Sequence, residues 1–234
     1  MIAISSLPYR WSPPRPSVAH RRISRVSPHN CFAEFVSAFP SVAILGGAAP
    51  GVRISCESQL EYHVALCAAY GPGVVSIEEQ LPKVGIHSRG RARYHSLDFR
   101  VTTSSGLRRG LAVKHTRGRG FAELLQDLPA IRRAVVPTLV DRLFLVTERN
   151  LCPIKVHNAE LFHGARRVEP EIDAALAAHV ETMATPMSIA DMLLAAGLPG
   201  QFFAAVRAIH WGLLDICTPE KIVPTTMVRP RGKT

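Results

Sequence analysis

The period of the apolar residues changes from two to 3.6 in the middle of the chain, and this change most constrains the fold. Apolar and polar residues alternate over 91–103, which predicts a strand. In that strand we expect Leu97, Phe99 and Val101 to face the core and Asp98 to face the opposite side. The acid is therefore set apart from the apolar side of the predicted sheet.

The residues that follow predict the rest of a layered core. A turn at 104–106 and a second alternating run at 110–115 predict a neighbouring strand. Helical spacing of the apolar residues then extends over 121–136, and the short apolar run 143–147 predicts a further strand. Strands that alternate with a helix in this way are typical of a sheet covered by helices.

Two elements precede this core and complete the predicted fold. Residues 55–70 have helical spacing and end at a Gly-Pro-Gly turn, and residues 74–80 alternate as a strand. The order helix, three strands, helix, strand predicts an α/β fold in which helices flank a mixed sheet. The glycines and proline within residues 31–54 predict a connector with one short strand near 42–45.

The last third of the chain predicts a small, mostly helical domain. Three helices are expected over 169–183, after the capping box at 188–191 and over 200–210, and a strand is expected over 211–217. This order is typical of a winged-helix-like module. The basic and acidic residues of this domain balance, and Arg207 is the only charged residue of its third helix. This favours a role in binding protein over a role in recognising DNA.

Positive charge is concentrated in the first two-thirds of the chain. The formal net charge is +10, and ten basic residues but only one acid, Asp98, lie between Lys83 and Ala122. This favours a phosphate backbone as partner, although a basic surface also aids solubility without any partner. The Pro/Arg-rich arm over 1–30 is a second candidate DNA contact. The candidate DNA-binding residues are Arg21, Arg22, Arg25, Arg91, Arg93, Arg117 and Arg119.

Three residues carry the side chains that metal-dependent phosphodiester hydrolysis requires. Glu61 lies on the first predicted helix, Asp98 on a strand, and Lys114 on the neighbouring strand. Hard divalent cations prefer carboxylate oxygens, and a nearby lysine orients water or stabilises developing charge. Each residue alone also has an ordinary structural interpretation, as an acid paired with an arginine or as a solvated side chain. The nuclease interpretation therefore depends on the three residues being brought together.

Several short motifs surround these three residues in a distinctive order. They are Ser58-x-x-Glu61, Val75-x-x-x-x-Gln80-x-Pro82, Asp98-Phe99 and Val113-Lys114, with Arg21–Ser27 upstream and Leu145–Arg149 and His157–Leu161 downstream. In this order they resemble TnsA-type endonuclease subunits of heteromeric transposases, which belong to the restriction-endonuclease-like superfamily. The resemblance covers roughly residues 20–165, and the C-terminal helices resemble that family's winged-helix domain more loosely.

The resemblance implies a restriction-endonuclease-like core, a winged-helix-like domain and an activity on double-stranded DNA. Such a subunit nicks one strand at each transposon end, an integrase-type transposase cuts and joins the other, and an ATPase regulator links the complex to its target. By position, Glu61 and Asp98 are implied to bind Mg²⁺ or Mn²⁺, with the Val113 carbonyl as a further ligand and Lys114 as the catalytic lysine. Gln80 borders the implied site, and the implied location is the bacterial cytoplasm, at the nucleoid when the subunit is bound to DNA.

Ala112 departs from this resemblance. The family places Glu or Gln two residues before the lysine, whereas alanine has no ligating atom. One interpretation is that another acid replaces the missing side chain, and Glu123 on the following helix is the candidate supporting residue. The second interpretation is a catalytically impaired subunit that binds DNA and the transposase. A stand-alone restriction or repair nuclease of the same fold is the third.

The remaining features bound the class of protein. The five cysteines are widely spaced and have no zinc-ligand spacing, which predicts reduced thiols in a cytoplasmic protein. No apolar run reaches the length of a membrane span, and no secretory signal pattern occurs. We therefore expect an arm and connector over 1–48, a nuclease domain over 49–165 and a winged-helix-like domain over 166–234.

Overall fold

The computed structural model describes residues 33–37 and 52–232, which fall into two compact units. The described part of the first unit ends at Leu151, and that of the second begins at Cys152. The basic arm over 1–30, the strand expected near 42–45 and the three arginines of the arm (Arg21, Arg22 and Arg25) lie outside the described residues. No described helix is both long enough and apolar enough to cross a membrane.

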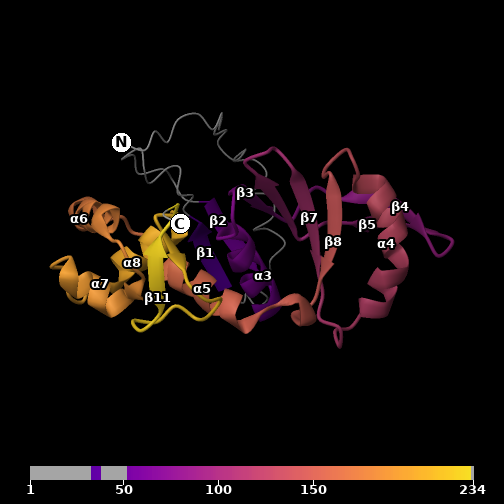
Figure 1. Cartoon of the computed structure of the whole chain (residues 1–234). Helices are drawn as coiled ribbons and strands as arrows, with labels where there is room; N and C mark the ends of the chain where they lie inside the picture. The colour runs from indigo at the N-terminus through magenta and orange to yellow at the C-terminus, as the bar shows by residue number, and fades with distance from the viewer. Residues whose placement is uncertain (1–32, 38–51, 233–234) are drawn as a thin grey trace. The chain divides into compact units, whose positions relative to one another are not determined.

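The first unit is a mixed α/β arrangement (Figure 1). Its elements are β1 (Ala33–Ser37), β2 (Val52–Cys56), α3 (Gln59–Ala69), β3 (Val74–Glu79), β4 (Val84–Ser88), β5 (Arg91–His95), β6 (Phe99–Thr103), β7 (Arg108–Val113), α4 (Phe121–Val135), β8 (Arg142–Val146) and the short 3-10 helix η1 (Glu148–Asn150). Four strands form the main sheet in the order β3-β6-β7-β8. The pairs β3/β6 and β6/β7 are antiparallel and β7/β8 is parallel, so the predicted mixed sheet flanked by helices is confirmed.

The core of this unit explains which face of the sheet α4 covers. Ala112 of β7 packs in one buried cluster with Ile131 and Val135 of α4 and with Val140, which precedes β8. Gly110 faces the same cluster, because a Cβ at that position would lie 2.7 Å from a methyl carbon of Leu97. β7 has buried residues on both faces, which is usual for a central strand in a sheet with helices on both sides.

Three elements were missed or merged in the sequence. The strand expected over 91–103 is two strands, β5 and β6, because the chain bends at Asp98. Leu97 consequently packs in the α4 cluster and not on the same face as Phe99, contrary to the simple alternation. The helix expected from residue 55 begins at Gln59, because residues 52–56 form β2 and pair with β1. The turn at Arg89-Gly90 is a sequence signal of the β4–β5 hairpin. The sequence prediction missed the hairpin because the segment is rich in charged residues.

The second unit is mostly helical and carries a small sheet. Its elements are α5 (Pro153–Gly164), α6 (Pro170–Thr182), β9 (Met187–Ser188), α7 (Ile189–Ala195), α8 (Phe202–His210), β10 (Leu214–Ile216) and β11 (Met227–Pro230). The three strands pair antiparallel in the order β10-β11-β9. Ser188 caps α7 by accepting a hydrogen bond from the Asp191 N–H, and Gly197 follows the helix with a φ of 71°, as the sequence predicts.

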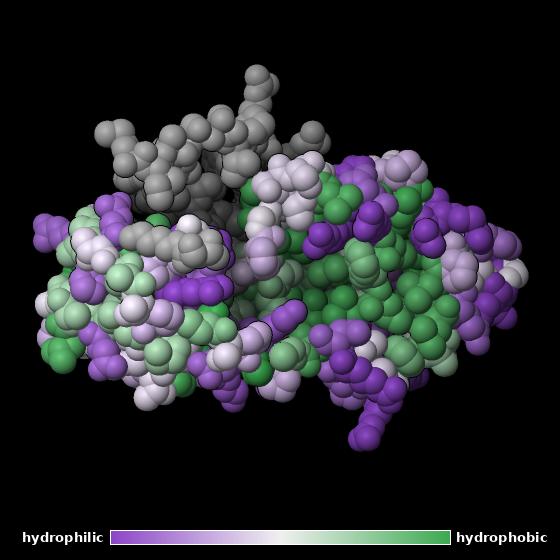
Figure 2. Space-filling model, viewed as in Figure 1, coloured by the Kyte–Doolittle hydropathy of each residue, from purple (hydrophilic) through white to green (hydrophobic). Residues whose placement is uncertain are grey.

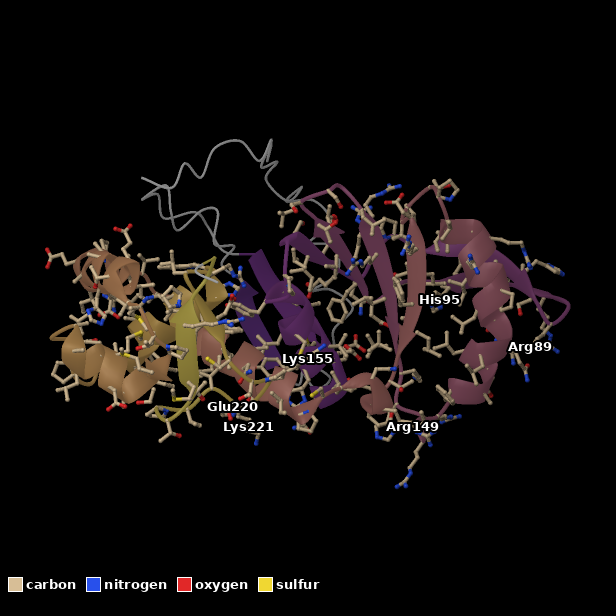
Figure 3. The ribbon with its side chains drawn as sticks, viewed as in Figure 1. Arg89, His95, Arg149, Lys155, Glu220 and Lys221 are labelled. Carbon is tan, nitrogen blue, oxygen red and sulfur yellow. The ribbon has the colours of Figure 1, made fainter. Side chains whose placement is uncertain are left out.

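Helix α5 belongs to this second unit, whereas the sequence placed it in the first domain. The side chain of Asn158 holds the loop between β10 and β11. Its Nδ2 donates to the Glu220 carbonyl at 3.0 Å, and its Oδ1 accepts from the Ile222 N–H at 2.9 Å. Figure 3 shows Glu220 and Lys221 of this loop near Lys155 of α5. The His157-Asn158 motif thus has a packing role within the second unit.

Candidate functional site

Asp98 lies where β6 begins, beside the end of β7. Its Oδ2 accepts a hydrogen bond of 2.6 Å from the Val113 N–H, and its own N–H donates to the Leu111 carbonyl. The backbone therefore fixes the carboxylate at the edge of the sheet. Burial raises the pKa of Asp98 to about 7, because a charged carboxylate loses its hydration there.

Glu61 lies in the first turn of α3, and its position follows from how the helix is capped. The Ser58 hydroxyl accepts from the Glu61 N–H at 3.2 Å and donates to Glu61 Oε1 at 3.0 Å. Glu61 Oε2 accepts from the Glu57 N–H at 2.9 Å. Glu61 therefore has a capping role of its own, in addition to the ligand role expected from the sequence. Burial raises the pKa of Glu61, and these hydrogen bonds oppose that rise.

The structure brings all three candidate catalytic residues within electrostatic reach of one another. After burial and the opposing Val113 hydrogen bond, the pKa of Asp98 responds to the negative charge of Glu61, which raises it, and to the positive charge of Lys114, which lowers it. Lys114 also lowers the pKa of Glu61. Glu57, which the sequence reasoning did not single out, raises the pKa of both acids. Its only sequence signal is its place just before the capping serine.

Ala112 is 1% exposed and lies in the α4 cluster. It follows Leu111, which pairs with Phe99, so it lies one residue beyond the last paired positions of β6 and β7 and just before Val113, whose N–H binds Asp98. Simple alternation along β7 would put Leu111 and Val113 on the core face and Ala112 on the other, but both faces of β7 are buried here. The position that carries an acid or glutamine in the resembled family is therefore a packed apolar position in this chain.

The remaining candidate site residues divide into two groups. Gln80 ends β3 with a φ of 48°, and its N–H donates to the Asp98 carbonyl at 2.6 Å, so it borders Asp98 as expected. Val113 is adjacent to Asp98 through the hydrogen bond described above. Glu123, in contrast, is exposed in the first turn of α4 and is not among the charges that shift the pKa of Asp98 or Glu61.

The described candidate DNA-binding arginines occupy two segments. Arg91 and Arg93 lie on β5, and Arg93 is 3.8 Å from the carboxylate of Asp127 on α4. Arg117 and Arg119 are exposed in the segment between β7 and α4, immediately after Lys114. The segment with Arg91 and Arg93 lies just before Asp98 in the chain. The segment with Arg117 and Arg119 lies just after Lys114.

A further acid, Glu148, fixes the segment that follows Lys114. The Glu148 carboxylate accepts from the Thr116 N–H at 2.9 Å and from the Thr116 hydroxyl, and it lies 3.6 Å from the His115 ring. The Thr116 hydroxyl bond is the main reason that the pKa of Glu148 is lowered to about 2. The Lys114 N–H donates to the Val146 carbonyl at the end of β8. The sequence reasoning quoted Glu148 within a motif without assigning it this role.

The donor set suits one kind of cation better than others. Among the described residues, no group of three or more His, Cys, Asp or Glu side chains is placed to hold a metal ion. Mg²⁺ commonly keeps several waters and binds through one or two carboxylates together with substrate phosphate oxygens. Asp98 and Glu61 are two partly buried acids, and the negative charge of Glu61 raises the pKa of Asp98. Such a pair of carboxylates fits that pattern.

Comparison with known proteins adds no relative to this picture. Neither the protein-family models nor the curated protein sequences contain a match to this chain.

Proposed function

We propose that this chain is a Mg²⁺-dependent DNA endonuclease that nicks one strand at transposon ends, as the TnsA-type subunit of a heteromeric transposase. The observation that carries the proposal is that Asp98, Glu61 and Lys114 lie close enough for their charges to influence one another, near the end of β7. The three residues are far apart in the sequence, and they occur in the order that the resemblance implies. Their side chains have the chemistry that phosphodiester hydrolysis requires.

The arrangement of the elements supports the same proposal. The first unit has the order helix, three antiparallel strands, helix, parallel strand within one sheet, which accords with a restriction-endonuclease-like core. The second unit, from α6 onward, has the order helix, strand, two helices, two strands with an antiparallel three-stranded sheet. That order accords with a winged-helix-like domain.

Each of the three side chains has a distinct part in the proposed reaction. Asp98, oriented by the Val113 N–H, and Glu61, oriented by the start of α3, would hold the cation, with the Val113 carbonyl beside them. Mg²⁺, when bound, neutralises phosphate charge and lowers the pKa of a water molecule. The Lys114 ammonium would orient the attacking water or stabilise the charge that develops on the phosphate.

The test combines the purified chain, an integrase-type transposase, and DNA that carries the transposon ends. Wild type is expected to nick one strand at each end with Mg²⁺, and Asp98→Ala is expected to abolish nicking. Glu171→Gln, which changes an exposed acid on α6, is the matched control and should nick like wild type. Nicking that survives Asp98→Ala would contradict the assigned site.

A catalytically impaired subunit is the second candidate, and the burial of Ala112 favours it. With a packed methyl group where the resembled family has an acid or glutamine, the site has two described carboxylates close to Lys114 and no side-chain ligand from β7. In that case the chain assembles with DNA and transposase, and wild type nicks under neither Mg²⁺ nor Mn²⁺. Assembly of Asp98→Ala at wild-type affinity, together with an inactive wild type, would establish this alternative.

A further inference from the structure

The β4–β5 hairpin is inserted between two residues of the candidate site. Its residues follow Gln80 and lead directly into Asp98. Two backbone hydrogen bonds close its base, from the Gln80 N–H to the Asp98 carbonyl and from the Leu81 N–H to the Leu97 carbonyl. The base of the hairpin is therefore fixed next to Asp98. Figure 3 shows Arg89 at the outer end of the hairpin and His95 nearer to the sheet.

An ion-pair cluster fixes the hairpin to α4. Asp127 is 8% exposed, and its Oδ1 accepts from the Ser88 hydroxyl at 2.5 Å. Arg89 donates to both oxygens of that carboxylate, from Nε and Nη2, at 3.2 Å each. Arg89 and Gly90 have φ values of 51° and 70°, so the chain turns in the left-handed region at both positions, as two-residue hairpin loops require. The hairpin is thus a fixed platform and not a free loop.

The outer face of the hairpin displays an aromatic ring on a small-residue surface. Tyr94 is 77% exposed and pairs with Gly85 across the two strands. A Cβ on Gly85 would lie 3.9 Å from Tyr94 Cε1, so the ring lies beside the glycine. His87 and Ala92, the next cross-strand pair on this face, are also exposed. The ring therefore presents one side to whatever approaches.

The charge around this face is positive. The segment from Lys83 to His95 holds four Lys and Arg residues and no acid. Asp127 partners Arg89 and lies near Arg93, but Lys83 and Arg91 are exposed and form no ion pair within the described part of the chain. Figure 2 shows hydrophilic side chains at this end of the first unit, beside a hydrophobic area over the sheet and α4.

We propose that the exposed surface of the β4–β5 hairpin binds DNA, where Tyr94 on the outer face packs against a base or sugar, and the exposed Arg91, beside the loop, and Lys83, at the base of the hairpin, bind phosphates. An exposed aromatic ring between unpaired cations matches the two chemistries of a nucleotide, a planar base and an anionic backbone. An acidic protein would satisfy the cations but has no comparable use for the flat ring. The inference rests on the proposed function only in taking DNA as the partner.

The experiment measures binding without cleavage. Fluorescence anisotropy follows a short labelled duplex of arbitrary sequence as the full chain is added in EDTA, so that no divalent cation is present. Tyr94→Ala is expected to weaken binding about tenfold, whereas Tyr94→Phe, which keeps the ring, binds like wild type. Arg91→Ala is expected to weaken binding and to reduce the slope of log affinity against log salt concentration by about one.

The matched control is Arg229→Ala, which removes an exposed arginine of β11 in the second unit. The proposal is overturned if Tyr94→Ala and Arg91→Ala both bind as tightly as wild type, or if Arg229→Ala loses as much affinity as Arg91→Ala. Loss of affinity for Arg91→Ala but not for Tyr94→Ala also overturns it, because the DNA is then bound through phosphate alone and not through the aromatic ring.

The outcomes separate this inference from the proposed nuclease. Hairpin variants that bind DNA normally while wild type nicks with Mg²⁺ would contradict the hairpin surface and leave the nuclease standing. Hairpin variants that lose affinity while wild type never nicks would support the surface and favour the impaired-subunit alternative.

Discussion

At the scale of single residues, burial and neighbouring charges act together on Asp98. Glu61, Asp98 and Lys114 were selected from their side-chain chemistry and their order in the sequence, and their catalytic roles stay predictions. Burial was not predictable in the same way. That Ala112 packs under α4, and that Glu57 adds a third negative charge, depend on how β7 and α3 pack, and local sequence does not determine that packing.

The raised pKa of Asp98 predicts a pH dependence of stability in the metal-free protein. The pKa is about 7 in the folded state against an ordinary 3.8, so between these values the folded state binds more protons than the unfolded state. The free energy of unfolding therefore falls as pH rises through this window. Asp98→Asn, which has no charge to bury, should weaken this dependence and raise the thermal midpoint at about pH 8.

The measurement is thermal unfolding in EDTA from about pH 4 to about pH 8, with wild type and Glu171→Gln expected to behave alike. An Asp98→Asn variant with the full wild-type pH dependence would show that Asp98 does not titrate in this range. Added Mg²⁺ should stabilise wild type most at the higher pH values, because cation binding requires the ionised carboxylate.

Replacing Ala112 with glutamate tests whether β7 can still contribute to the site. The position is 1% exposed, so we expect Ala112→Glu to lower the free energy of unfolding by roughly 3 kcal/mol in EDTA. Because Ala112 precedes Val113, whose N–H binds the Asp98 carboxylate, a new carboxylate that reaches the site should let Mg²⁺ recover part of that loss.

Ala130→Glu is the matched control for this change. Ala130 is on α4 in the same buried cluster, and its replacement should destabilise to a similar extent without any recovery by Mg²⁺. Equal behaviour of the two variants in calorimetric titrations and in chemical denaturation would mean that β7 has no access to the cation.

At the scale of elements, the sequence predicted best where a period is long and undisturbed. Helix α4 and strand β3 were placed to within a residue or two, because each has a clear spacing and a turn at its end. The hairpin β4–β5 and the strand β2 were missed, since their strands are short and their pairing partners decide whether they form. Helix α5 was assigned to the wrong unit because its partner loop lies far along the chain.

The Asn158 clamp predicts a graded loss of stability in the second unit. Asn158→Ala removes two hydrogen bonds to the loop between β10 and β11 and should lower the free energy of unfolding by about 2 kcal/mol. His157→Ala should cost less, because its ring nitrogen is 3.4 Å from the Ile222 carbonyl. Chemical denaturation measures both, and an Asn158→Ala variant as stable as wild type would exclude the clamp as a stabilising contact.

At the scale of the whole molecule, the two units differ in how their charged residues are distributed. The excess of cations lies before residue 166, and the only charged residue of α8, Arg207, is 3% exposed. Its guanidinium lies 2.8 Å from Asp173 and 3.2 Å from Glu169, so it holds α8 to α6 and is not presented to DNA. The sequence predicts that the second unit binds another protein. Its helix α8 has no exposed cation that could bind a phosphate.

Arg207→Ala should separate the stabilities of the two units. Removing one partner of a buried ion pair typically costs about 3–5 kcal/mol, because the remaining carboxylate stays desolvated. Differential scanning calorimetry should therefore show one transition of the full chain shifted down, while the transition that responds to Asp98→Asn stays in place. The DNA affinity of Arg207→Ala at low temperature should match that of wild type. A large loss of affinity would contradict the conclusion that Arg207 does not contact DNA.

The contact between Asn158 and the loop at 220–222 also sets an order of events during synthesis. Helix α5 leaves the ribosome more than sixty residues before the loop that holds it. Until that loop has emerged, α5 lacks the partner for its amide side chain, so the second unit cannot reach its final packing while the first is already complete. A chain that stops before residue 220 would therefore keep a finished first unit joined to an incomplete second unit.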